Sequence, residues 1–69
     1  MAICIRVNGS EEAFLPETIL DLLQRRGLDP RARGLAVAVN GAVVTRRAWE
    51  SARLAAGDEV EIVRPFTGG

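Results

Sequence analysis

The chain has 69 residues, nine basic and nine acidic side chains with a formal net charge of zero, one cysteine and no histidine. One small domain of this size buries roughly 60% of its unfolded surface and has no room for a large enclosed substrate pocket. This composition argues against nucleic-acid or anionic-membrane partners, and it excludes a disulfide framework, an ordinary zinc site and Ser/His or Cys/His catalysis. We therefore expect no metal site, no cofactor bound by the chain itself and no catalysis by its own side chains.

The N-terminal segment predicts a β-hairpin. In residues 2–7 the apolar side chains alternate, so Ile3, Ile5 and Val7 share a core-facing side. The run is too short and too soon interrupted by Arg6 for a signal peptide or a membrane span, which makes the cytoplasm the expected location. Residues 8–11 are expected to form a turn, and residues 12–15 a returning strand that Pro16 ends.

A short helix is predicted next. Thr18 is a good N-cap whose hydroxyl accepts from the amide of Asp21, while the Asp21 carboxylate reaches back to the cap. The apolar residues Ile19, Leu22 and Leu23 follow at helical spacing, and Gly27 matches a left-handed C-cap. A helix of about two to three turns does not persist alone, so it needs a sheet to pack on.

The second half of the chain predicts three more strands. Residues 35–39 alternate large and small side chains, and Asn40-Gly41 is a strong hairpin signal before a returning strand over residues 42–45. Residues 46–53 form a polar crossover with Trp49 as a lid on the core edge. A tight turn at residues 54–58 leads into a strand over residues 59–64, with Val60 and Ile62 facing one way.

The chain ends in Phe66-Thr67-Gly68-Gly69, which has little to pack against a core. Glycine allows close approach of the backbone to another surface, so this segment suits insertion into another protein's active site. A C-terminal carboxyl group ordinarily has a pKa of about 3.5, so the Gly69 carboxylate is ionised at neutral pH and available to attack an activated phosphate. We expect residues 1–65 to form the domain and residues 66–69 a flexible tail.

The order strand, strand, helix, strand, strand, strand predicts an α+β fold with one main helix on one face of a mixed sheet of about five strands. This is the β-grasp arrangement of ubiquitin-like proteins. Several segments together resemble the ThiS family of sulfur carriers in thiamine biosynthesis: residues 18–23, residues 36–44, Trp49, Leu54 with Gly57-Asp58, and residues 60–63 through Gly68-Gly69. Thr45 departs from the proline that the family often has before the basic residue at Arg46.

The resemblance implies a covalent substrate rather than an enzyme. The Gly69 carboxylate would attack ATP in a ThiF-like activating enzyme that uses Mg²⁺, giving an acyl adenylate. A persulfide sulfur donor would then displace AMP and leave a thiocarboxylate on the chain. A ThiG-like thiazole synthase would consume this thiocarboxylate. Phe66, Thr67 and Gly68 would thread through the partner's active site, and the free carrier is expected to be a monomer.

The partners must also recognise the domain. The predicted strand alternation leaves one sheet face uncovered, a weakly apolar candidate for docking with Arg64 near the strand end. Its expected residues are Cys4, Arg6, Phe14, Ala36, Ala38, Val63 and Arg64. A shift of one residue in the register would instead turn Phe14 into the core, and both interpretations stay open.

Cys4 is expected to be a small hydrophobe rather than a reactive thiol. Two other functions stay open: a molybdopterin-synthase small-subunit-like sulfur carrier, and a non-covalent interaction module similar to the TGS domain. Extension of the C-terminus by one residue would discriminate a carrier from a docking module.

Overall fold

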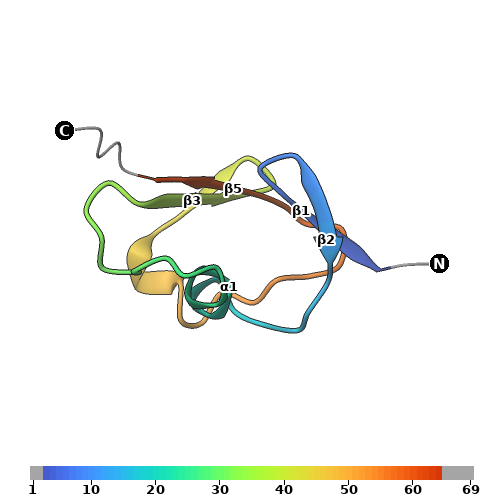
Figure 1. Cartoon of the computed structure of the whole chain (residues 1–69), viewed down its shortest axis with the longest axis horizontal. Helices are drawn as coiled ribbons and strands as arrows, with labels where there is room; N and C mark the ends of the chain where they lie inside the picture. Colours follow the sequence, from blue (N-terminus) through green and yellow to red (C-terminus); the bar gives the residue numbers. More distant parts are fainter. Residues whose placement is uncertain (1–2, 65–69) are drawn as a thin grey trace.

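A computed structural model of the chain describes residues 3–64. In chain order the elements are β1 (Cys4–Val7), β2 (Ser10–Ala13), α1 (Ile19–Arg25), β3 (Ala36–Val39), β4 (Ala42–Val44), the 3₁₀ helix η1 (Arg46–Ala48) and β5 (Glu59–Val63). The strands form one five-stranded sheet in the order β2-β1-β5-β3-β4, and α1 lies against one side of it (Figure 1). β1 and β5 are parallel, whereas the other neighbouring strands are antiparallel. The predicted β-grasp fold is confirmed, with the last strand beside the first.

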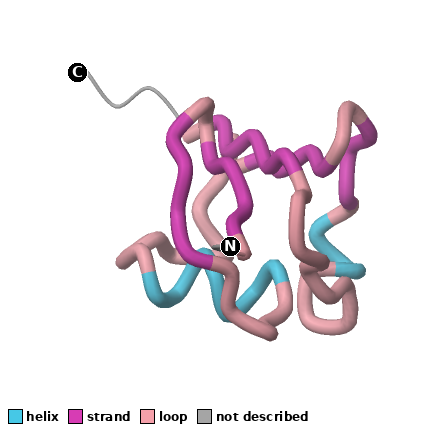
Figure 2. Tube along the Cα trace, turned by 90° about the vertical axis from the view of Figure 1, so that its right-hand side faces the viewer, coloured by secondary structure: helices cyan, strands magenta, loops and turns pink. Residues whose placement is uncertain are grey.

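Both hairpins turn on an asparagine followed by a glycine. Asn8 and Asn40 have positive φ angles of 51° and 52°, and the following glycines have φ of 84°. Two successive residues with positive φ make a two-residue turn whose twist matches that of the strands. The strands and their tight turns lie on one side of the molecule, and the helical segments lie on the other (Figure 2).

The first turn is shorter than the sequence predicted. Val7 pairs directly with Ser10, so the returning strand begins two residues earlier than expected and ends at Ala13. The predictions of a four-residue turn over residues 8–11 and of a strand over residues 12–15 are therefore wrong. The Asn–Gly pair supplies both positive-φ positions that the turn requires, so Ser10 and Glu11 belong to β2 instead.

Helix α1 begins and ends as predicted. The Asp21 amide donates to the Thr18 hydroxyl and the Thr18 amide donates to the Asp21 carboxylate, both at 3.1 Å, which completes a capping box. At the other end Gly27 has a φ of 77°, its amide donates to the Gln24 carbonyl at 3.0 Å, and the Leu28 amide donates to the Leu23 carbonyl at 2.9 Å. This is a Schellman motif, which satisfies carbonyls that the helix end would otherwise leave unpaired.

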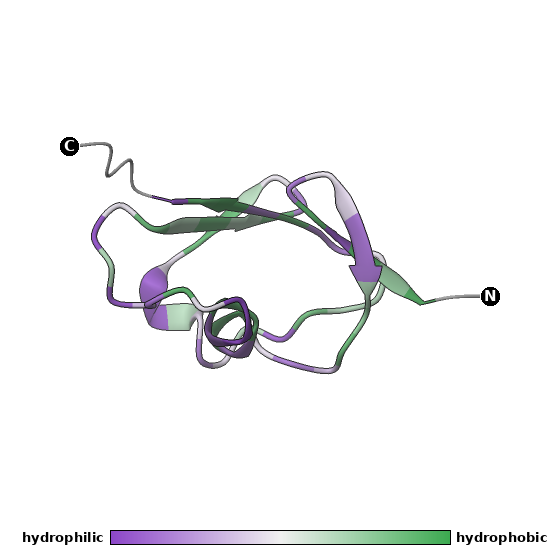
Figure 3. Ribbon diagram, in the orientation of Figure 1, coloured by the Kyte–Doolittle hydropathy of each residue, from purple (hydrophilic) through white to green (hydrophobic). Residues whose placement is uncertain are grey.

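The core lies between the sheet and α1. Its buried residues are Ile5, Val7, Ile19, Leu22, Leu23, Leu35, Val37, Trp49, Leu54, Val60 and Ile62. Hydrophobic residues run along β3 and β5, whereas β2 is drawn largely in hydrophilic colours, as its sequence Ser-Glu-Glu-Ala requires (Figure 3). Ile3 was expected in the core but is 60% exposed. It precedes β1, so the prediction for Ile3 is wrong.

Trp49 belongs to the core rather than to a ligand site. Its side chain is 2% exposed, and its indole N–H donates to the Val44 carbonyl at 2.9 Å. The Arg46 guanidinium lies 4.8 Å from the centre of the ring. The same guanidinium donates to the carbonyls of Pro30, Ala32 and Leu35, so Arg46 ties the connection between α1 and β3 to η1.

Candidate functional site

The predicted reactive end of the chain, Phe66, Thr67, Gly68 and Gly69, lies outside the described residues, and so does Ala2 of the first predicted strand. The structure does describe the root from which the C-terminal segment departs. β5 is the middle strand of the sheet, paired with β1 on one side and β3 on the other, and Arg64 follows it directly. The segment beyond Arg64 is therefore attached to the most fully paired strand of the domain.

Asparagines of the two hairpin turns hold the ends of β5. At its start, the Asn40 amide donates to the Glu59 carbonyl at 2.7 Å and the Glu59 amide donates to the Asn40 side-chain oxygen at 2.9 Å. At its end, the side chain of Asn8 bonds to the backbone of Ile62. Each asparagine thus satisfies a turn and a strand together, which fixes the root of the C-terminal segment within the domain.

The sheet face opposite α1 carries most of the predicted docking residues. The inward side chains of β1, β3 and β5 are in the core, so alternation and the strand pairings put the others on the open face. Val63 is 61% exposed and pairs with Ala36, while Ala38 lies across from Val43. The predicted members on this face are Cys4, Arg6, Ala36, Ala38 and Val63.

Val43 is an open-face residue that the sequence prediction missed. It is 77% exposed, the highest value among the large hydrophobic residues of the described chain. Counting strand positions back from the Asn40-Gly41 turn pairs Val43 with Ala38, so the sequence did contain the signal. We call Ala36, Ala38, Val43 and Val63 the open-face patch.

Two predicted members of the docking surface lie elsewhere. Phe14 follows β2 and packs, half-buried, against the core, so its predicted place on the open face is wrong. The register is the cause: Glu12 pairs with the buried Ile5, and Phe14 lies two positions further along on the same side. Arg64 is also misplaced: it lines a hollow together with Arg26 and Leu28 on the side of the sheet that α1 covers. One step of alternation beyond Val63 reverses the side to which Arg64 points.

Charged groups border the open-face patch. Arg6 lies 4.0 Å from Glu59, and both side chains are more than half exposed. Glu61 is exposed and pairs with Ala38 across β3 and β5. Cys4 is a half-buried free thiol in β1. Within residues 3–64 there is no cluster of three or more His, Cys, Asp or Glu side chains that could hold a metal ion. The open-face patch thus has an apolar centre and a charged border.

Comparison with protein families gives a match to the model of the ThiS family over residues 5–69. This match spans nearly the whole chain and includes the terminal Gly68-Gly69. The chain belongs to the ThiS family. Membership makes it a small sulfur carrier protein of thiamine biosynthesis rather than an enzyme in itself. It also favours this pathway over the molybdopterin and TGS-like alternatives.

Two solved structures of a ThiS relative are similar in sequence and fold. The crystal structure of thiamine biosynthesis protein ThiS from Geobacter metallireducens is 26% identical, with a TM-score of 0.77 over 97% of this chain and 100% of that one. The solution structure of a thiamine biosynthesis protein from the same organism is 26% identical, with a TM-score of 0.76 over 100% of this chain and 88% of that one. No curated protein matches the chain.

Neither helix in residues 3–64 has the length and apolar character that a bilayer span requires.

Proposed function

We propose that the ThiS-family chain carries sulfur as a thiocarboxylate on Gly69. A carboxylate oxygen of Gly69 attacks the α-phosphorus of ATP in a ThiF-like activating enzyme that uses Mg²⁺, and pyrophosphate leaves. The terminal sulfur of a persulfide donor then displaces AMP from the acyl carbon and forms an acyl disulfide. A thiol attacks the donor's sulfur in this disulfide, which releases the thiocarboxylate and leaves a disulfide between the thiol and the donor, and a ThiG-like thiazole synthase takes the sulfur from the thiocarboxylate. The observation that carries this proposal is the family match, which continues through residues 66–69.

The chemistry fits what the chain lacks and what it has. Within the described residues no metal-binding cluster is present, and every side chain in the core is apolar or Trp49, so the core holds no acid, base or nucleophile. A carboxylate is a poor acyl donor, and its conversion to an adenylate supplies a good leaving group. We assign the donors and metal ions that stabilise this step to the activating enzyme.

The domain, residues 1–65, serves as the recognition unit, and residues 66–69 serve as the tail that enters the partner. The open-face patch is the proposed docking surface, with Cys4 and Arg6 on its β1 side. Its exposed valines and alanines offer apolar area that association would bury, and the surrounding charges would set the orientation. β5 belongs to this surface and leads into the tail, so docking of the patch would aim the tail.

The activation step is tested by ATP–pyrophosphate exchange with a ThiF-like enzyme and Mg²⁺. The chain should support exchange, and a chain extended by one alanine after Gly69 should not, because its carboxylate lies one residue too far along. The extended chain is a matched control, since its domain is unchanged. Equal exchange with both chains would contradict attack by the Gly69 carboxylate.

A further inference from the structure

A hollow of about 310 Å³ lies where β5 ends beside the C-terminal end of α1. Its lining residues are Asn8, Arg26, Leu28, Ile62 and Arg64. Ile62 is buried and Leu28 half-buried, whereas the two arginines are exposed. The hollow is therefore a partly apolar recess with two guanidinium groups, and it is separate from the open-face patch.

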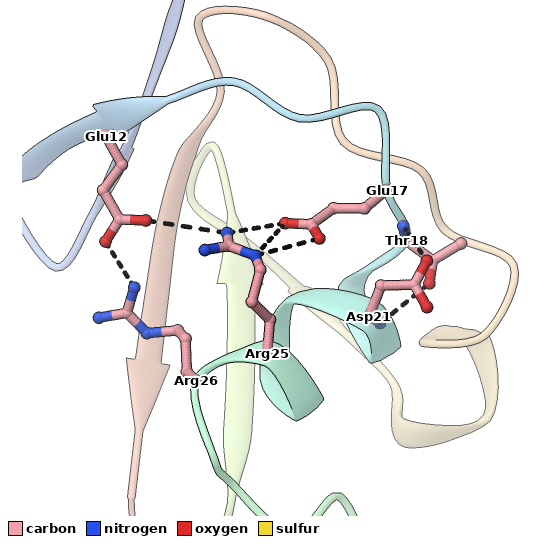
Figure 4. Close-up of polar contacts among 6 residues, drawn as sticks. All are labelled: Glu12, Glu17, Thr18, Asp21, Arg25 and Arg26. Atoms are coloured by element: carbon pink, nitrogen blue, oxygen red, sulfur yellow. Dashed lines mark hydrogen bonds and ion pairs between the residues drawn. The ribbon is translucent and has the colours of Figure 1, made fainter.

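Glu12 in β2 and Glu17 just before α1 form ion pairs with the arginines at the end of α1 (Figure 4). Arg25 donates to both carboxylate oxygens of Glu17 at 2.8–3.3 Å and lies 3.9 Å from Glu12. Arg26 donates from one terminal nitrogen to Glu12 at 2.5 Å. A guanidinium has five N–H donors, so this single bond orients Arg26 and leaves most of its donors available.

The hollow keeps an excess of positive charge. Of the two arginines that line it, Arg26 pairs with Glu12, and within residues 3–64 Arg64 makes no ion pair. The α1 carbonyls near the hollow are already bonded to the amides of Gly27 and Leu28. The group that fits the recess is therefore an anion able to accept from two guanidinium groups, as a carboxylate or a phosphate does.

The position of the hollow selects between these anions. Gly69 lies five residues beyond Arg64, which limits the distance between them to about 18 Å for an extended chain. When the tail enters a narrow channel, its reacting end meets the nucleotide and its root stays at the channel entrance. The surface that meets the root is protein, so the matching anion is an acidic side chain.

We propose that the Arg26–Arg64 hollow receives an Asp or Glu side chain at the entrance of the activating enzyme's active site. This inference rests on the proposed function, since it names a contact that the carrier makes while its tail is engaged. The contact would fix the register between the root of the tail and the channel, and the two positive charges would raise the rate of encounter with an acidic rim.

The test is steady-state pyrophosphate release by a ThiF-like enzyme with the chain as the varied substrate. Arg64→Gln and Arg26→Gln should each raise KM about two- to fivefold with little change in kcat, as expected for loss of one partly exposed charged contact. The salt dependence of KM should become less steep in both variants, because one attractive charge is gone.

Two control variants separate docking from structure. Glu12→Gln breaks the same ion pair as Arg26→Gln but leaves both guanidinium groups in the hollow, so its KM should not rise. Arg33→Gln removes a positive charge from the connection between α1 and β3, away from the hollow, and should leave KM unchanged. Circular dichroism and thermal unfolding show whether each variant is folded.

The outcomes distinguish the two proposals. If KM is unchanged for folded Arg26→Gln and Arg64→Gln and activation is normal, the proposed role of the hollow is overturned and the carrier function is unaffected. An equal rise in KM for Glu12→Gln and Arg26→Gln also overturns it, because the ion pair would then be the cause. No activation of the unaltered chain by an enzyme active on another carrier contradicts the proposed function itself.

Discussion

Asn8 bonds to Ile62 as a neighbouring strand residue would, although 54 positions separate them. The Ile62 amide donates to Asn8 Oδ1 at 2.8 Å, and Asn8 Nδ2 donates to the Ile62 carbonyl at 3.3 Å. Asn8, in the N-terminal turn, thus continues the β1–β5 pairing beyond the last residue of β1. The Asn8 side chain thus connects the N-terminal turn to β5, the strand that precedes the tail.

Substitution of Asn8 is expected to loosen the end of β5. Asn8→Gly keeps the positive φ that the turn needs and removes both side-chain bonds, so the free energy of unfolding should fall by about 1–3 kcal/mol. Asn8→Ala should cost more, because alanine is also strained at positive φ. Urea denaturation of both variants measures these values. An unaltered midpoint for Asn8→Gly would show that the Ile62 bonds contribute nothing.

Arg46 is expected to stabilise the connection between α1 and β3. It donates to the carbonyls of Pro30, Ala32 and Leu35 and stacks on Trp49, so Arg46→Ala should reduce the free energy of unfolding by about 1–3 kcal/mol. Arg46→Lys should recover part of the loss, since an ammonium retains the charge but not the planar fork. Arg47→Ala, at the neighbouring exposed position, is the matched control. Equal effects at both positions would contradict this role.

The Glu17–Arg25 pair should make a pH-independent contribution in the neutral to moderately alkaline range. The hydrogen bond from Arg25 to Glu17, opposed by burial and aided by the charges of Glu17 and Glu12, raises the pKa of Arg25 above its ordinary value. A base with a raised pKa adds stability that is fully present below its unfolded pKa and is lost only as the pH rises through the folded value. That loss falls in strongly alkaline solution.

The difference in unfolding free energy between the unaltered chain and Glu17→Gln should therefore be the same at pH values of about 7 and 10. Denaturant titrations at the two pH values check this. Asp29→Gln, which affects a pair with highly exposed side chains, is the control for general charge effects. A difference that shrinks by half at the higher pH would contradict the assignment of the shift to Arg25.

The open-face patch is expected to affect docking and not stability. Val43→Thr and Val63→Thr keep the β-branched shape at exposed positions, so together they should change the free energy of unfolding by less than about 0.5 kcal/mol. They should raise KM for the activating enzyme severalfold by placing hydroxyl groups in an apolar contact. Thr45→Ser is a conservative control outside the patch. An unchanged KM for the double variant would remove the patch from the proposal.

Features set by neighbouring residues were predictable from the sequence. The Thr18–Asp21 capping box joins residues three apart, and the Schellman motif at Gly27 involves only the last turn of α1. The Asn40-Gly41 turn likewise contains its own conformational requirement. The alternation of Val60 and Ile62 correctly identified the inner face of β5, and with it the face that the helix covers.

Features that depend on distant contacts were not predictable in the same way. Phe14 lies on the core side because it follows by two positions Glu12, the partner of the buried Ile5, and the two-residue turn at Asn8-Gly9 sets this pairing. Arg64 is a different case: it shares its side with Val60 and Ile62 by alternation, so the pattern in the sequence already placed it on the side that α1 covers. The bond between Asn8 and Ile62 and the Glu12–Arg26 pair join segments whose proximity only the fold creates.

The most direct test of the carrier function is the intact mass of the chain after incubation with Mg-ATP, a ThiF-like activating enzyme and a persulfide donor. A chain lacking Gly69 is the control. The proposed function predicts a mass gain equal to the replacement of one oxygen atom by sulfur, found only in the full chain and located by fragmentation at Gly69. No gain, with the enzyme shown to be active on another carrier, would contradict the thiocarboxylate proposal.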